Sequence, residues 1–215
     1  QTANIGTEEP VKESESLFSI IASSGTMGII IVAILLVLAV IATVIFFERY
    51  ATIKQAGRID ENFINNIRAN VSSGNIAGAK ALCQSTDSPV ARMVEKGISR
   101  IGKPLADINT AIENAGKLEV YGLEKNVSVL ATISGAAPMI GFLGTVIGMI
   151  LSIFEIANSG GQIDIKLLAD GLYTAMTTTV AGLLVGIVSY IAFNHLVSRT
   201  NKVVYNMEAN SVEFL

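Results

Sequence analysis

Three long stretches without a charged residue dominate the pattern along the chain. They cover Thr26–Phe47, Val127–Phe154 and Gly171–Asn194, which are 22, 28 and 24 residues long. Because an α-helix rises ~1.5 Å per residue, each stretch is long enough to cross a hydrocarbon layer about 30 Å thick. Buried helices of a soluble core are the alternative, but a chain of this size cannot cover three such helices with polar layers. We therefore predict an all-α fold with three transmembrane helices.

Lysine and arginine are distributed unequally between the two sides of these predicted spans. One side holds Arg49, Lys54, Arg58, Lys117, Lys125, Arg199 and Lys202, and the other only Lys12 and Lys166. The positive-inside rule then places the N-terminus outside and the C-terminus inside. The chain begins at Gln1, which indicates either a trimmed chain or a removed secretory signal, and a removed signal would also place residues 1–25 outside.

The spans and their orientation divide the chain into seven parts. These are an outer leader (1–25), the first span (26–47), a cytoplasmic helical domain (48–126), the second span (127–157), an outer loop (158–170), the third span (171–194) and a cytoplasmic tail (195–215). Within the leader, Leu17–Ile21 is apolar and predicts either an interfacial helix on the outer face or an ordinary helix start.

Helix signals recur in the polar region. The break at Ser72–Gly74 precedes Asn75, a candidate N-cap, and Ser88-Pro89 is typical of a helix start. No strong breaker follows Leu105 before the second span, so we expect one long helix to run from the polar region through that span. The third span is likewise expected to continue past His195. The second and third spans thus extend into a helical cytoplasmic domain.

Small and hydroxyl residues recur every three or four positions in the second and third spans, and so share one face of each helix. The stripes are Ser134, Pro138, Gly141, Thr145, Gly148, Ser152 and Glu155, and Ala175, Thr179, Gly182, Gly186 and Ser189. One interpretation is tight helix packing, with Pro138, Gly141, Gly144, Gly148, Gly182 and Gly186 as candidate packing residues. The other is a pore or groove, in which a homo-oligomer would arrange the hydroxyls in rings along a narrow hydrated path.

Composition and residue counts exclude several classes of function and kinds of site. Hydrophobic residues make up 51% and charged residues 15% of the chain, with a net charge of −3, which fits a membrane protein and excludes a nucleic-acid binder. The single cysteine, Cys83, and the single histidine, His195, make neither an internal disulfide nor a zinc site. Gly97–Lys103 reads G-x-x-x-x-G-K, but Pro104 replaces the hydroxyl that a P-loop needs. We expect no enzyme activity, cofactor or metal, although a Ser134–His195 intramembrane hydrolase remains an alternative.

No titratable residue lies in the middle of any span. Glu155 and Asp170 lie at the outer ends, and His195 lies at the inner end. A proton relay through a membrane usually needs a titratable group at depth. If the chain belongs to a proton path, a partner must therefore supply the carboxylate.

Two runs carry a family resemblance. Ala137–Gly148 reads A-P-x-x-G-x-x-G-T-V-x-G and Gly171–Leu183 reads G-x-x-x-A-x-x-x-T-x-x-G-L. Both resemble the ExbB/TolQ/MotA family of proton-channel motor subunits. Three spans with an outer N-terminus are most similar to ExbB and TolQ, because MotA-type stators have four. The resemblance covers about residues 26–200, with its motifs confined to the second and third spans.

The resemblance implies a function in the bacterial inner membrane, with a periplasmic N-terminus and a cytoplasmic C-terminus. ExbB-like subunits form a pentamer around the spans of an ExbD-like dimer, whose aspartate carries the proton, and a TonB-like protein couples the motion to outer-membrane transport. By motif position, Thr145 and Thr179 would line the proton path, with Thr174 and Thr178 as further candidates. Many family members have glutamate at the position of Thr174, so a proton role of that glutamate does not transfer. A TolQ-like role in envelope maintenance and a non-conducting scaffold are the alternatives.

Overall fold

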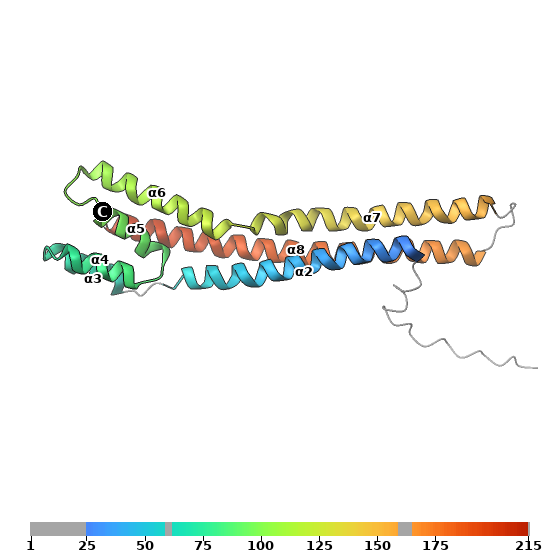
Figure 1. Cartoon of the computed structure of the whole chain (residues 1–215), viewed down its shortest axis with the longest axis horizontal. Coiled ribbons are helices and arrows are strands. Elements are labelled where there is room, and N and C mark those ends of the chain that lie inside the picture. The colour runs from blue at the N-terminus through green and yellow to red at the C-terminus, as the bar shows by residue number, and fades with distance from the viewer. Residues whose placement is uncertain (1–24, 59–61, 159–164, 215) are drawn as a thin grey trace, which may run out of the picture. The chain divides into compact units, whose positions relative to one another are not determined.

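The computed structural model describes residues 25–58, 62–158 and 165–214, and these ranges contain helices joined by short turns, without a strand. The helices are α2 (Gly25–Ala56), α3 (Asn62–Ser72), α4 (Ile76–Ser85), α5 (Pro89–Ile98), α6 (Leu105–Glu124), α7 (Val127–Asn158) and α8 (Ile165–Phe214) (Figure 1). Three helices are long and apolar enough to cross a membrane. This confirms the all-α fold with three candidate spans. The leader 1–24, with Leu17–Ile21, and residues 159–164 of the predicted outer loop lie outside the described residues.

The long helix expected through the second span is interrupted, so that prediction was wrong. Helix α6 ends at Glu124 and α7 begins at Val127 (Figure 1). Between them Asn126 has φ = 63°, a left-handed conformation that cannot continue a right-handed helix and that asparagine tolerates better than most residues. The Arg49 side chain of α2 donates a hydrogen bond of 3.3 Å to the carbonyl of Gly122, in the last turn of α6. Carbonyls of a last turn lack partners within their own helix, so Arg49 stabilises this helix end.

The extension of the third span agrees with the expectation. Helix α8 is continuous over 50 residues, from Ile165 to Phe214, and so includes both the predicted span and the tail. His195 lies within it. The polar continuation of this helix therefore remains helical far beyond the apolar run.

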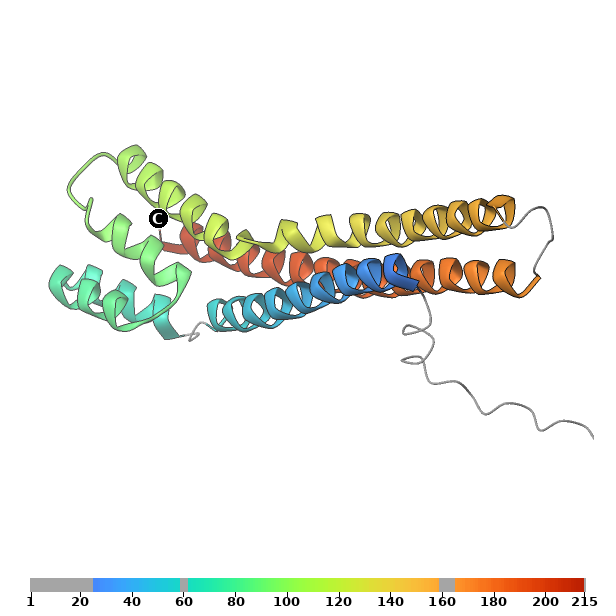
Figure 2. The same cartoon turned by 45° about the vertical axis from the view of Figure 1, so that its right-hand side comes forward.

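The chain forms two compact units. The described residues of the first lie within 1–38 and 136–186, and those of the second lie within 39–135 and 187–215. In the first unit, α7 lies beside α8 in both views (Figure 1, Figure 2). The α2 residue Ile31 also reaches this contact, because its Cδ1 lies 3.2 Å from the position that a Cβ on Gly144 would occupy. The first unit therefore contains the parts of α7 and α8 that carry most of the stripe residues.

Side-chain caps define the short helices of the second unit. The Asn75 side chain accepts a hydrogen bond of 3.0 Å from the Gly78 N–H at the start of α4. The Ser88 hydroxyl accepts one of 3.1 Å from the Ala91 N–H at the start of α5, where Pro89 occupies the first turn. Both caps agree with the sequence prediction. Each satisfies an N–H that has no partner within its helix.

One part of the core of the second unit lies between α5 and α6. Val90, Val94 and Ile98 repeat every four residues on α5 and are at most 2% exposed. Ile112 of α6 is fully buried, and a Cβ added to Gly97 of α5 would lie only 2.7 Å from the Ile112 Cδ1. This spacing places one apolar face of α5 against α6. Burial of that face is the main source of stability for two packed helices.

Candidate functional site

The stripes of α7 and α8 meet each other within one chain. A Cβ on Gly141 would lie 2.7 Å from the carbonyl oxygen of Thr178, and a Cβ on Gly182 would lie 2.6 Å from that of Ala137. Real Cβ atoms do not approach backbone so closely, so only glycine permits this contact. The two helices therefore approach each other through small residues, the arrangement typical of helix pairs in membranes.

Three threonine hydroxyls bridge the helices beside these glycines. Thr145 of α7 donates a hydrogen bond of 3.0 Å to the carbonyl of Ala175, and its hydroxyl also contacts that of Thr179. Thr179 of α8 lies 3.2 Å from the Gly141 carbonyl, and the Thr178 hydroxyl lies 3.3 Å from that oxygen and 2.8 Å from the Ala175 carbonyl. We call Thr145, Thr178, Thr179 and the carbonyls of Gly141 and Ala175 the hydroxyl cluster.

The members of the hydroxyl cluster differ in exposure. Thr178 is 1% exposed, so its side chain lies inside the contact between the helices. A Cβ on Gly144 would fall 2.8 Å from the Thr178 Cβ, which explains why a glycine faces it. Thr145 and Thr179 are only half-buried, so the pair they form remains partly accessible from outside the chain. Among the candidate path-lining residues, Thr178 alone is buried, and Thr145 and Thr179 are the half-buried ones that belong to the hydroxyl cluster.

The cluster has hydrogen-bonding capacity but no charge. A hydroxyl has one proton to donate and two lone pairs to accept with, and the proton is free to rotate between acceptors. Thr179 has two acceptors within reach, the Gly141 carbonyl and the Thr145 hydroxyl. It can therefore redirect its proton without a change in net charge. Neutral hydroxyls can pass or stabilise a proton, but they cannot hold one at physiological pH.

The remaining candidates of the two spans take different positions. Thr174 is half-buried and is not part of the hydroxyl cluster. A Cβ on Gly148 would meet the Ala175 Cβ at 3.3 Å, and Gly186 is buried. Pro138 lies inside α7, where it removes one N–H from the helix ladder. The packing candidates Gly141, Gly144, Gly148 and Gly182 thus all lie in the contact of α7 with α8.

The hydrolase pair suggested by the sequence is not assembled. The Ser134 hydroxyl donates to the carbonyl of Ala131 at 2.7 Å. The His195 ring lies against Tyr50 and Phe46, with centroid distances of 6.0 and 6.4 Å. Among the described residues there is no hydrogen bond between Ser134 and His195, and no group of three or more potential metal ligands occurs in them.

Sequence reasoning missed the backbone part of the hydroxyl cluster. The carbonyls of Gly141 and Ala175 each lie within hydrogen-bond distance of two threonine hydroxyls, and Thr178, with one proton to donate, is within reach of both carbonyls. Side-chain motifs carry no direct signal for such acceptors. The available signal was indirect, because glycine or alanine at close helix contacts leaves its carbonyl open to a neighbouring helix.

A comparison with models of protein families shows to which family the chain belongs. Residues 85–209 match the model of the MotA/TolQ/ExbB proton channel family, which is more than half of the chain and includes both stripes. The chain belongs to this family. It is therefore a membrane protein related to the subunits of proton-channel motors, as the two sequence runs suggested.

Individual relatives place the chain among ExbB and TolQ proteins, with ExbB the more frequent. It is 37% identical to the biopolymer transport protein ExbB of Aquifex aeolicus over 87 residues, which cover 40% of this chain and 58% of the relative. It is 33% identical to the Tol-Pal system protein TolQ of Haemophilus influenzae over 93 residues, which cover 43% of this chain and 40% of that protein. The chain thus spans about half the length of these curated relatives. A putative ExbB-like protein of Synechocystis aligns over 78% of this chain and 80% of its own length, at 25% identity.

Proposed function

We propose that this chain is an ExbB-like subunit of a motor driven by the proton-motive force in the bacterial inner membrane. Several copies, five by the family resemblance, surround the spans of an ExbD-like dimer, each partner chain contributing one span. The assembly transmits its motion through a TonB-like protein to transport across the outer membrane. The observation that carries this proposal is the accessible Thr145–Thr179 pair, set in helices that contain no charged residue at that depth.

The hydroxyl cluster and the partner's carboxylate have complementary roles in this proposal. A transmembrane potential supplies ~2.3 kcal/mol per charge per 100 mV, which drives a proton toward the carboxylate. A neutralised carboxylate no longer requires a polar neighbour and can move past the ring of hydroxyls. When it loses the proton on the other side, the Thr145–Thr179 pairs stabilise the charge again by donating hydrogen bonds. Thr178 serves in packing, because it is buried within the chain.

The test removes hydroxyls without changing the shape of the side chains. Thr145→Val and Thr179→Val, each in the assembled complex with the ExbD-like partner, are expected to reduce proton flux into proteoliposomes at least tenfold. Thr177→Val is the matched control, since its hydroxyl bonds to the Tyr173 carbonyl of its own helix. Serine at either position retains the hydroxyl and should retain flux. Undiminished flux in both valine variants, with intact assembly, would refute the proposal.

A non-conducting scaffold is the second candidate, and one observation favours it. The threonines and glycines of the stripes already satisfy each other between α7 and α8 of a single chain. In that case Thr145→Val and Thr179→Val would lower the stability of the assembly, and transport per assembled complex would stay unchanged. A TolQ-like role is supported by the similarity to the Haemophilus protein, and envelope integrity in a deletion strain distinguishes it from transport.

A further inference from the structure

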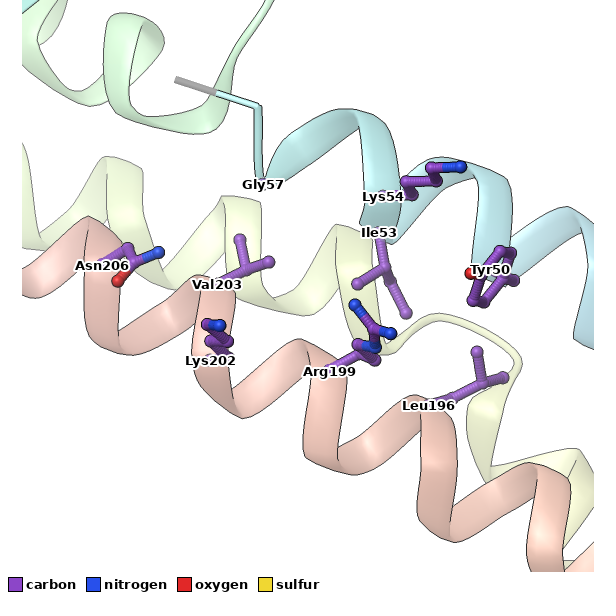
Figure 3. Close-up of a pocket in the computed structure, with 9 residues that line it drawn as sticks. All are labelled: Tyr50, Ile53, Lys54, Gly57, Leu196, Arg199, Lys202, Val203 and Asn206. Atoms are coloured by element: carbon purple, nitrogen blue, oxygen red, sulfur yellow. The ribbon is translucent and has the colours of Figure 1, made fainter. Parts of the chain in front are cut away.

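A pocket in the second unit gathers positive charge between α2 and α8. Its volume is about 180 Å³, and its polar lining comes from Tyr50 and Lys54 of α2 and from Arg199, Lys202 and Asn206 of α8 (Figure 3). The Arg199 guanidinium extends from α8 toward Ile53 of α2 in this view. None of the nine lining residues is acidic.

The donors of this pocket are suited to a phosphate group. Two lysines, an arginine, a tyrosine and an asparagine line one concavity, and charged donors make the stronger hydrogen bonds to phosphate oxygens. Within the part of the chain that the structure describes, no carboxylate forms an ion pair with Lys54, Arg199 or Lys202. Their charges are therefore available to a ligand.

The floor of the pocket is apolar. Ile53 is 3% exposed, Leu196 is fully buried, and Val203 is 6% exposed. The three cations above this floor are exposed, and Tyr50 and Asn206 are half-buried. An apolar floor below a polar rim matches an amphiphile, whose phosphate meets the rim while the first carbons of its chains contact the floor.

The position along the helices points to the headgroup layer of a membrane. Lys54 follows Phe47, the end of the first charge-free run, by seven residues, and Arg199 and Lys202 follow Asn194, the end of the third, by five and eight. At the helical rise this is roughly 7–12 Å of helix beyond the apolar runs. Headgroups occupy roughly 5–8 Å on each side of the hydrocarbon core. Long basic side chains close the remaining distance by bending toward the interface.

We propose that this pocket binds the phosphate of an anionic phospholipid, and we call it the headgroup pocket. Basic residues beside any membrane span attract anionic lipids in a general way. The headgroup pocket differs because Arg199 and Lys202 of α8, a neutral donor from each helix and the rim residue Lys54 line one cavity. It holds one lipid in place between α2 and α8, and this does not depend on the proposed motor function.

The test titrates the purified full chain in an uncharged detergent with phosphatidylglycerol, with phosphatidylcholine of the same acyl chains, and with inorganic phosphate. Native mass spectrometry counts the bound lipids. The double variant Arg199→Gln/Lys202→Gln is expected to lose a preference for phosphatidylglycerol of roughly 10-fold or more. The control Arg100→Gln/Lys103→Gln removes the same charge from exposed positions outside the pocket and should keep the preference. An equal loss in both variants would refute a defined pocket.

A second variant separates the shape of the pocket from its charge. Tyr50→Phe/Asn206→Leu keeps every cation but removes the two neutral donors, and it should weaken phosphatidylglycerol binding several-fold at unchanged helical content. Unchanged binding in this variant would overturn the proposal, as would equal binding of the two lipids by the original chain. Displacement of the lipid by millimolar inorganic phosphate would assign the cavity to a soluble anion and contradict the lipid.

Discussion

Replacement of Gly141 by alanine tests the contact between α7 and α8. The added Cβ would lie 2.7 Å from the Thr178 carbonyl oxygen and must move by 0.3 Å to reach 3.0 Å, and by 0.7 Å to reach an ordinary contact of 3.4 Å. The atom in the way belongs to the backbone, so a side-chain rotation cannot relieve the clash. The helices must separate.

The separation also weakens the hydroxyl cluster. The Gly141 carbonyl accepts from Thr179 at 3.2 Å and from Thr178 at 3.3 Å, and a shift of 0.3–0.7 Å takes both distances to the limit of a hydrogen bond or beyond it. Overpacking costs typically 1–3 kcal/mol, and hydrogen bonds between membrane helices contribute about 0.6 kcal/mol each. We therefore expect Gly141→Ala to lower the free energy of unfolding by about 2–4 kcal/mol.

The assay is thermal unfolding of the purified chain in detergent, followed by circular dichroism. For a chain of this length the expected loss corresponds to a decrease in Tm of about 4–9 °C. Gly135→Ala is the matched control on the same helix, because a Cβ there meets nothing within 4 Å. If Gly141→Ala unfolds at the same temperature as Gly135→Ala, α7 and α8 do not pack as described.

Three further predictions concern the second unit. Arg92 donates to both oxygens of Glu119 at 2.7 Å and to Asp87 at 2.8 Å, so Arg92→Ala should destabilise the chain by about 1 kcal/mol in denaturant titrations. The control Lys96→Ala removes an exposed cation from the same helix and should change stability little, and equal effects of the two variants would contradict the role of Arg92. Burial, and secondarily Glu95, raises the pKa of the Cys83 thiol to about 11, so alkylation by iodoacetamide at pH 8 should be at least ~100-fold slower in the folded chain than after denaturation, and rapid labelling of the folded chain would contradict its burial. Because Asn126 has a positive φ, Asn126→Gly should leave stability nearly unchanged, while Asn126→Val should cost about 1–2 kcal/mol, and equal melting temperatures would show that the turn is not left-handed.

The spans and the caps were predictable because their causes are local. A charge-free run of more than twenty residues has few stable arrangements other than a membrane-spanning helix. The caps at Asn75 and Ser88 depend only on residues within four positions. The break after Glu124 was not predictable in this way. Asparagine only permits the left-handed turn at Asn126, and the helix end is stabilised by Arg49, which is 73 residues away from its acceptor Gly122 in the sequence.

The stripes illustrate the same limit inside the membrane helices. Their spacing predicted that Gly141 and Thr145 share a face, but periodicity does not tell which helix lies opposite that face. Thr177, Thr178 and Thr179 are consecutive, so they point in three directions about 100° apart. Only the packing reveals that Thr178 is buried, that Thr179 meets Thr145, and that Thr177 bonds within its own helix.

The most direct test of the proposed motor is a structure of the assembled complex with its ExbD-like partner, determined by electron cryo-microscopy. The proposal predicts that Thr145 and Thr179 of each copy face the central axis. Their hydroxyls should contact the partner's membrane carboxylate directly or through one bridging water molecule. A structure in which both threonines face acyl chains, or in which no helix occupies the centre of the ring, would contradict it.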